Sequence, residues 1–171
     1  MRCRFSEEIN MPYLLLSAFI VIFDQLFKKW CVHVLSMGIS RRFLPGILNL
    51  TMVHNYGASW GILAGRTNLL LVVTGIVCLG IIVYLLLGKP EQKLGRLSLA
   101  CILGGAIGNA VDRFVLGYVV DMFETAFMSF PVFNVADCFI CVGAALLCIH
   151  VFTEETKEAK KKKLSAGEKD A

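Results

Sequence analysis

The sequence has little charge and few residues that bend or cross-link a chain. Charged side chains make up 18% of its 171 residues, and there are only 4 prolines and 3 histidines. With 57% hydrophobic residues and a mean hydropathy of +0.70, this shortage of charge excludes an ordinary soluble domain. The net charge of +4 is spread over both ends and several loops, so we expect no surface that binds nucleic acid. The composition predicts a membrane protein.

The cysteines and histidines do not form a metal-binding pattern. Cys138 and Cys141 have the CxxC spacing, but no second cysteine pair and no histidine cluster accompanies them. Most cysteines lie in apolar runs, where a thiol behaves as a small hydrophobic group and not as part of a disulfide framework. We therefore predict no metal and assign no other cofactor. The cysteines in apolar runs are Cys78, Cys101, Cys138, Cys141 and Cys148.

Four apolar stretches are long enough to cross a bilayer. The first covers residues 11 to about 35, and the second, residues 67–88, carries no charge at all. The third begins at Leu97 and is uncharged to Val111, and the fourth follows Asn134 and ends near Thr153. The basic start of the chain resembles a signal peptide, but no small-residue cleavage site follows it, so we interpret the first stretch as a retained span.

Two segments outside the spans have strand-like sequences. Residues 38–66 contain a Pro45–Gly46 turn signal and a β-favouring run at 47–53, which together predict a small β element. Residues 114–136 are expected to leave the helix, with extended backbone at 118–120 and a turn at Pro131. Four phenylalanines make this loop apolar enough to lie against lipid or to cover a ligand, namely Phe123, Phe127, Phe130 and Phe133.

The expected fold is an all-α membrane protein with four transmembrane helices, a small extracytoplasmic β element and an extracytoplasmic loop between helices 3 and 4. Residues 1–153 form a single domain, and residues 154–171 are a charged tail that we expect to be solvated and partly disordered. Four spans place both termini on one side, where eleven basic residues fall, against six on the other side. The positive-inside rule then predicts that both termini are cytoplasmic.

Polar residues recur where these spans end. Asp24 and Lys28 are four residues apart, so they can form an ion pair that either neutralises itself or orients a polar site. Gly104 and Gly108 permit close helix contact, and Asn134 suits a helix N-cap. In the predicted topology eight polar residues share the depth of the outer membrane surface, which indicates one site. These are Asp24, Asn55, Asn109, Asp112, Arg113, Asp121, Asn134 and Asp137.

The residue types in this set favour acid–base chemistry. No serine, cysteine or lysine has a base at a recognisable spacing, which disfavours a covalent nucleophile. Two neighbouring carboxyl groups can hold one proton between them, so that one activates water while the other protonates a carbonyl. The pattern therefore predicts an aspartyl hydrolase, and we expect Arg113 to pair with a neighbouring acid.

At these positions the chain resembles the lipoprotein signal peptidase family, also called signal peptidase II. The resemblance covers residues 11 to about 153, in order and with family-like spacing. Ser59, Trp60 and Met122 depart from the family pattern at positions that concern substrate fit. The matching pieces are Asp24–Gln25 with Lys28, Asn55 with Gly57 and Ala58, GGAIGNAVDR at 104–113, VVD at 119–121 and FNVAD at 133–137.

The resemblance implies a monomeric aspartyl endopeptidase of the bacterial inner membrane that removes the signal peptide from diacylglyceryl-modified prolipoproteins, before the lipid-modified cysteine. It implies that Asp121 and Asp137 are the catalytic dyad and that Asn55 lies near the substrate. Globomycin is the inhibitor it implies. The supporting residues would be Asn109, Asp112, Arg113 and Asn134, with Asp24 and Lys28 stabilising the outer end of the first span.

Two other classes of function remain open from the residues. A small transporter or channel could use Asp24, Asp112, Asp121 and Asp137 as an acidic relay, although a relay favours charges along the whole membrane depth. A non-catalytic assembly factor could use Gly104 and Gly108 for partner contact.

Overall fold

The computed structural model describes residues 2–58, 62–87 and 93–167. Four helices account for most of the chain, and each contains a stretch long and apolar enough to cross a membrane. The predicted four-span fold is therefore confirmed. The helices are α1 (Arg2–Val34), α2 (Thr67–Leu87), α3 (Lys93–Val115) and α4 (Val135–Gly167).

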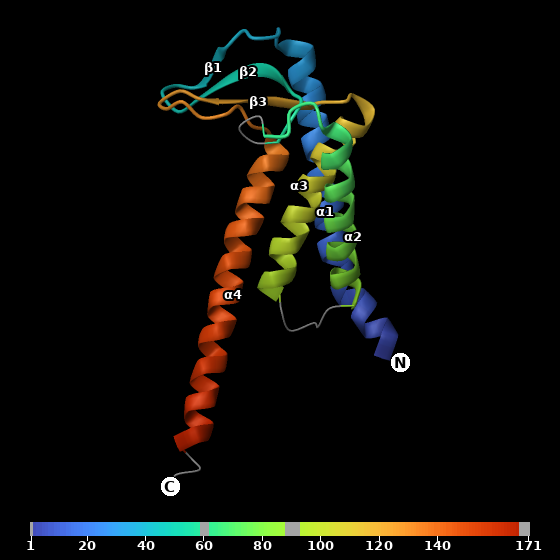
Figure 1. Ribbon diagram of the computed structural model, residues 1–171, viewed down its shortest axis with the longest axis vertical. Coiled ribbons are helices and arrows are strands. Elements are labelled where there is room, and N and C mark those ends of the chain that lie inside the picture. Colours follow the sequence, from blue (N-terminus) through green and yellow to red (C-terminus); the bar gives the residue numbers. More distant parts are fainter. Residues whose placement is uncertain (1, 59–61, 88–92, 168–171) are drawn as a thin grey trace.

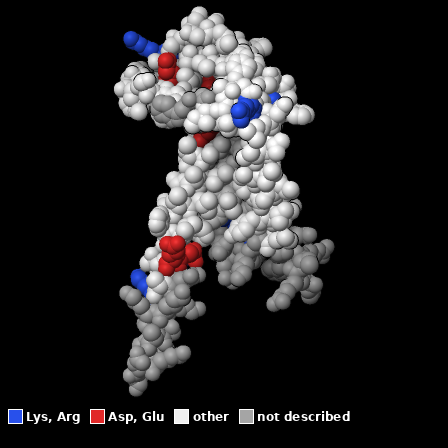
Figure 2. Space-filling model, in the orientation of Figure 1, with Lys and Arg blue, Asp and Glu red and all other residues white. Residues whose placement is uncertain are grey.

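Helix α3 is the centre of the bundle. In its apolar window 56% of the residues are buried, against 17–22% in the other three spans. It packs against α1, α2 and α4, and Figure 1 shows it between α4 on one side and α1 with α2 on the other. The flank of the bundle carries almost no charged side chains in Figure 2, as a lipid-facing surface requires.

Glycines bring α3 close to its neighbours. A Cβ atom at Gly104 would meet the side chain of Ile20 in α1, and one at Gly105 would meet the carbonyl oxygen of Ala136 in α4. The close contact predicted for the α3 glycines is therefore present, and it lets α1 and α4 reach the polar residues of α3.

A three-stranded antiparallel sheet covers one end of the bundle (Figure 1). Its strands are β1 (Arg41–Leu44), β2 (Leu48–Asn55) and β3 (Val119–Thr125), in the order β1-β2-β3. The sequence predicted strands in both segments but not that they join: Val53 of β2 pairs with Asp121 of β3, and Asn55 pairs with Val119. Pairing of β2 with β3 places Asn55 beside Asp121.

The loop after β3 is closed at its base. The carbonyl oxygen of Phe133 accepts hydrogen bonds from the backbone N–H groups of Met122 (3.0 Å) and Phe123 (2.7 Å). The N–H of Phe133 donates to the carbonyl oxygen of Phe123 (3.0 Å). The rings of Phe123 and Phe133 also pack with centroids 5.6 Å apart. The chain therefore returns to β3 just before α4 begins.

Three predicted boundaries are wrong. Helix α3 begins at Lys93 instead of Leu97 and continues to Val115, so residues 114 and 115 are still helical. Helix α4 continues past the predicted end of its span near Thr153 to Gly167, so most of the tail, which was expected to be partly disordered, is helical. No proline or glycine interrupts residues 154–166, and Lys157 pairs with Glu154 at 2.8 Å. Ser59 and Trp60 lie outside the described residues.

The glycine contact can be tested by adding one methyl group. We expect Gly105→Ala to lower the free energy of unfolding by about 1–3 kcal/mol, because its Cβ would overlap the Ala136 backbone. The matched control is Gly80→Ala in α2, where a Cβ would meet no described atom within 4 Å. Thermal unfolding in detergent measures both, and equal stability of the two variants would contradict the close α3–α4 contact.

Candidate active site

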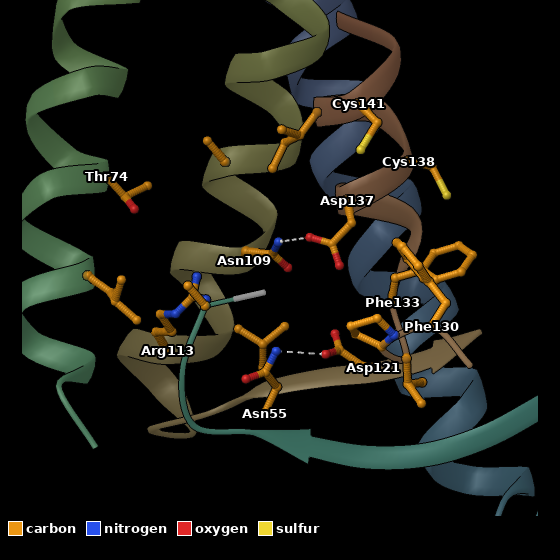
Figure 3. Close-up of a pocket in the computed structure, with 17 residues that line it drawn as sticks. Asn55, Thr74, Asn109, Arg113, Asp121, Phe130, Phe133, Asp137, Cys138 and Cys141 are labelled. Atoms are coloured by element: carbon orange, nitrogen blue, oxygen red, sulfur yellow. Dashed lines mark hydrogen bonds between the residues drawn. The ribbon is translucent and has the colours of Figure 1, made fainter. Parts of the chain in front are cut away.

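A cavity of about 520 Å³ lies where α2, α3 and α4 meet the sheet. We call it the acidic pocket because Asp121 and Asp137 both line it, and in Figure 3 their carboxyl groups point toward one another. Polar groups from two other elements complete this end, namely Asn55 of β2 and Asn109 and Arg113 of α3. The remaining wall is mostly apolar and comprises Ala58, Leu70, Thr74, Ala106, Val119, Phe130, Pro131, Val132, Phe133, Cys138, Ile140 and Cys141.

Asp121 is almost completely buried, with 2% of its surface exposed. Its Oδ2 accepts a hydrogen bond from Asn55 Nδ2 (3.0 Å), and its Oδ1 accepts one from Asn134 Nδ2 (2.6 Å). Burial, and next the charge of Asp137, raise the pKa of Asp121 to about 7, although both amide hydrogen bonds oppose the shift. This acid therefore retains a proton close to neutral pH.

Asp137 is held differently, by the first turn of α4. Its N–H donates to Asn134 Oδ1 (2.9 Å), and its Oδ2 accepts the Asn134 N–H (3.1 Å), which is a reciprocal N-terminal cap. The predicted N-cap at Asn134 is thus confirmed. Asn109 Nδ2 donates to the other oxygen of Asp137 at 2.8 Å. Two N–H donors and the helix N-terminus stabilise a carboxylate here.

Asn134 links the two acids. It is fully buried, and its Nδ2 donates to Asp121 Oδ1 and also to Asn109 Oδ1 (3.0 Å). Its backbone and side chain hold Asp137 at the same time. A single residue therefore bonds to both carboxyl groups, because its side-chain N–H donates to Asp121 while its backbone N–H and side-chain oxygen hold Asp137.

Beneath the pocket lies a buried charge cluster formed by Asp24, Lys28 and Asp112. The ammonium group of Lys28 lies 2.8 Å from Asp24 and 3.0 Å from Asp112, and it donates to Asn109 Oδ1 at 3.0 Å. The predicted pair of Asp24 and Lys28 is confirmed, but the cation is shared with a second acid. All three charged residues are at most 3% exposed.

The charge cluster reaches the backbone on both sides of the site. Asp24 Oδ1 accepts the N–H of Ala136 (2.9 Å), which precedes Asp137. Asp112 Oδ2 accepts the N–H of Val120 (3.0 Å), which precedes Asp121. Asp24 therefore holds the backbone next to Asp137, and Asp112 holds the backbone next to Asp121.

Two features of the site differ from the sequence prediction or were missed by it. Among the described residues Arg113 makes no ion pair; its Nη2 donates to the carbonyl of Gly57 at 2.9 Å. The expected pairing of Arg113 with an acid is therefore not seen as a direct contact in the described part of the chain: Lys28 is the cation that contacts Asp112, and Arg113 attracts Asp137, Asp121 and Asp112 only at longer range. Gln25 had no predicted role, yet its amide donates to Asp112 Oδ1 (2.8 Å) and to Gly108 O (3.1 Å).

The described residues contain no group of three His, Cys, Asp or Glu side chains arranged to hold a metal ion. The two pocket acids instead have amide donors as neighbours. The fold and the pocket together define a multi-pass membrane protein with its polar site at one end of the spans.

Residues 16–153 match the family described as signal peptidase (SPase) II. The chain is 43% identical over 157 residues to the lipoprotein signal peptidase of Enterococcus faecalis, covering 91% of this chain and 96% of that one. It is 42% identical over 144 residues to that of Latilactobacillus sakei, covering 84% and 95%. A bacterial membrane enzyme solved at 2.3 Å superimposes with a TM-score of 0.80 and 30% identity, covering 85% and 90%. The chain therefore belongs to the signal peptidase II family and is a membrane peptidase.

Removing the shared cation should unfold the site. We expect Lys28→Met to cost about 3–5 kcal/mol of stability, because two buried carboxylates lose their counter-charge. The control is Lys29→Met, which changes the exposed neighbour and should stay within about 0.5 kcal/mol. Both are measured by thermal unfolding in the same lipid-free detergent, and similar losses in the two variants would show that the charge cluster is not needed.

Proposed function

We propose that the protein is an aspartyl endopeptidase of the bacterial inner membrane that removes the signal peptide from diacylglyceryl-modified prolipoproteins, before the lipid-modified cysteine. The observation that carries the proposal is the placement of Asp121 and Asp137 on one pocket, joined through Asn134. The names of the family and of its relatives support the substrate class.

The unlike surroundings of the two acids assign them different roles. Asp121 holds the proton, since its pKa is raised to about 7, and Asp137 is the carboxylate. A water between them loses a proton to Asp137 as it attacks the peptide carbonyl, while Asp121 gives its proton to the carbonyl oxygen. The resulting tetrahedral diol collapses when the C–N bond breaks. The leaving nitrogen takes the proton from Asp137, and one hydroxyl of the diol returns its proton to Asp121 as the carboxyl product forms.

The pocket walls suit a substrate that arrives through lipid. One side is formed by Leu70 and Thr74 of α2 and the other by Ile140 and Cys141 of α4, so the pocket lies between two lipid-exposed helices. An apolar signal helix can approach between them. The segment between β3 and α4, residues 126–134, is called the aromatic loop. Its residues Phe130 and Pro131 line the same pocket and limit the water that reaches the acids.

Orientation and inhibition are part of the proposal. The excess of basic residues on the side of the termini supports cytoplasmic termini, with the sheet and the pocket at the outer surface. The enzyme works as a monomer because one chain supplies both acids. Globomycin, a cyclic peptide, would occupy the two acids as a substrate that cannot be cut.

The acidic-relay alternative fits the structure less well. A relay needs charged groups along the membrane depth, but α2 contains no Asp, Glu, Lys, Arg or His, and the pocket acids and charge cluster lie at the sheet end of the other spans.

The dyad is tested by neutral replacements of similar size. We expect Asp121→Asn and Asp137→Asn each to lower cleavage of a lipidated precursor more than about a hundredfold, because proton transfer is lost. Glu124→Gln, on the same strand but outside the pocket, is the matched control and should cleave normally. The assay compares lipidated with unlipidated precursor, with and without globomycin. Full activity of both aspartate variants would refute the proposal.

The raised pKa of Asp121 predicts the pH profile. Asp121 must be protonated to act as the acid, so kcat/KM should fall as the pH rises above about 7. The Asn55 hydrogen bond lowers this pKa, so Asn55→Ala should move the falling limb to higher pH, whatever it does to the maximal rate. If the falling limb of the pH profile does not move in the Asn55→Ala variant, a group other than Asp121 causes the fall.

A further inference from the structure

The two cysteines of the CxxC sequence lie on the wall of the acidic pocket. Cys138 and Cys141 both line this pocket, and Figure 3 shows them on α4, the helix that carries Asp137. Both thiols are free and exposed. The proposed hydrolysis uses neither of them. A pair of reactive side chains therefore stands in the pocket without a role in the chemistry derived above.

The spacing of the two thiols decides what can join them. Residues three apart on a helix lie on the same face, with Cβ atoms about 5–6 Å apart. A disulfide needs a Cβ–Cβ separation of about 3.5–4.5 Å, so a direct bond between Cys138 and Cys141 would require α4 to distort. One atom bound to both sulfurs spans the wider separation and leaves the helix intact. The geometry favours a bridging atom over a disulfide.

The surroundings limit the identity of the bridging atom. A closed zinc site takes four protein ligands. Within the described part of the chain, no third His, Cys, Asp or Glu is arranged with these thiols to hold a metal ion. The missing ligand must therefore arrive with the bound group. A monosubstituted trivalent arsenical meets this condition, because its arsenic atom bonds to one carbon and to two sulfurs.

Asp137 favours a reaction that consumes neutral thiols. Its carboxylate directly precedes Cys138 and lines the same pocket, so it disfavours the thiolate on which alkylation and disulfide exchange depend. An arsonous acid condenses with two thiols: two As–S bonds form, two As–O bonds break, and each thiol proton leaves with a hydroxyl group as water. Arsenic remains trivalent, so no oxidant is needed.

The pocket has room for the organic substituent of such a compound. Its volume of about 520 Å³ lies in the usual range of small-molecule sites, about 300–1,000 Å³. Phe130, Phe133 and Ile140 line it together with the two cysteines. An aryl group on the arsenic atom can pack on the phenylalanine rings in an offset or edge-to-face arrangement.

We propose that Cys138 and Cys141 form a dithiol site that binds one aryl-substituted trivalent arsenical, with the arsenic atom bridging the two sulfurs. The adduct lies on the α4 wall beside Asp137 and fills part of the acidic pocket. It therefore also blocks cleavage of a lipidated precursor. Only this last consequence rests on the proposed function; formation of the adduct does not.

The test is intact-protein mass spectrometry of the full chain in detergent, after reaction with phenylarsine oxide in an excess of glutathione. Glutathione removes arsenic that is held by one protein thiol, whereas two thiols on one chain hold it through their high effective concentration. We expect one retained phenylarsenic group per chain, which 2,3-dimercaptopropanol releases. Cys138→Ser and Cys141→Ser should each lower the retained adduct at least about tenfold.

The matched control is Cys148→Ser, which removes another exposed thiol of α4. Cys148 lies seven residues beyond Cys141, about 10.5 Å along the helix, which is too far for one atom to bridge. This variant should retain the adduct as the parent chain does. Thermal unfolding checks that each variant is folded, and alanine replaces serine in any variant that is not.

Three results would overturn the dithiol site. They are a folded parent chain that retains no adduct, an adduct that survives the loss of Cys138 or of Cys141, and an adduct that Cys148→Ser removes. Cleavage of the lipidated precursor by the modified protein is measured separately. An adduct on the two cysteines that leaves cleavage at the parent rate would support the dithiol site and contradict the proposed role of the pocket.

Discussion

The contact on which the site depends is the one between Lys28 and two buried carboxylates. A cation in an apolar interior is stable only when it is paired and its remaining hydrogen-bonding groups are satisfied. Here Asp24, Asp112 and the Asn109 amide surround the ammonium group. The carboxylate oxygens are completed by backbone N–H groups of β3 and α4. The charge cluster thereby ties α1, α3, β3 and α4 together at one point.

The asymmetry of the two pocket acids follows from the elements that carry them. Asp121 lies on a strand, where neighbouring backbone N–H groups serve the sheet, so only side-chain amides reach its oxygens. Asp137 lies in the first turn of a helix, where unpaired N–H groups are available to an anion. A strand and a helix N-terminus therefore give two identical side chains different hydrogen-bond donors.

The sequence predicted those parts of the structure that depend on near neighbours. The spans follow from uncharged length, and the Asn134 cap and the Asp24–Lys28 pair depend on spacings of three and four residues. Pairing of β2 with β3 could not be predicted, because it joins segments more than sixty residues apart along the chain and depends on how the helices place their ends. The contact of Lys28 with Asp112 could not be predicted either, because these residues are also far apart along the chain.

Arg113 illustrates why a correct residue can be given a wrong partner. Its position on the polar face of α3 is clear from spacing, but whether an acid or a carbonyl lies at the end of so long a side chain is decided by the loop at Gly57. The helical extension of α4 was missed for another reason. Charge alone suggested disorder, although the residues there are good helix formers.

Closure of the aromatic loop at its base has a consequence for how the family can vary. The pairing of Phe123 with Phe133 fixes the chain on both sides of the loop, so the separation of the two acids does not depend on the residues between β3 and Phe133, 126–132. This part can be lengthened, shortened or exchanged while the reacting groups keep their spacing. The part of the pocket wall formed by Phe130 and Pro131 can therefore be varied separately from the strand and the helix that hold the two acids.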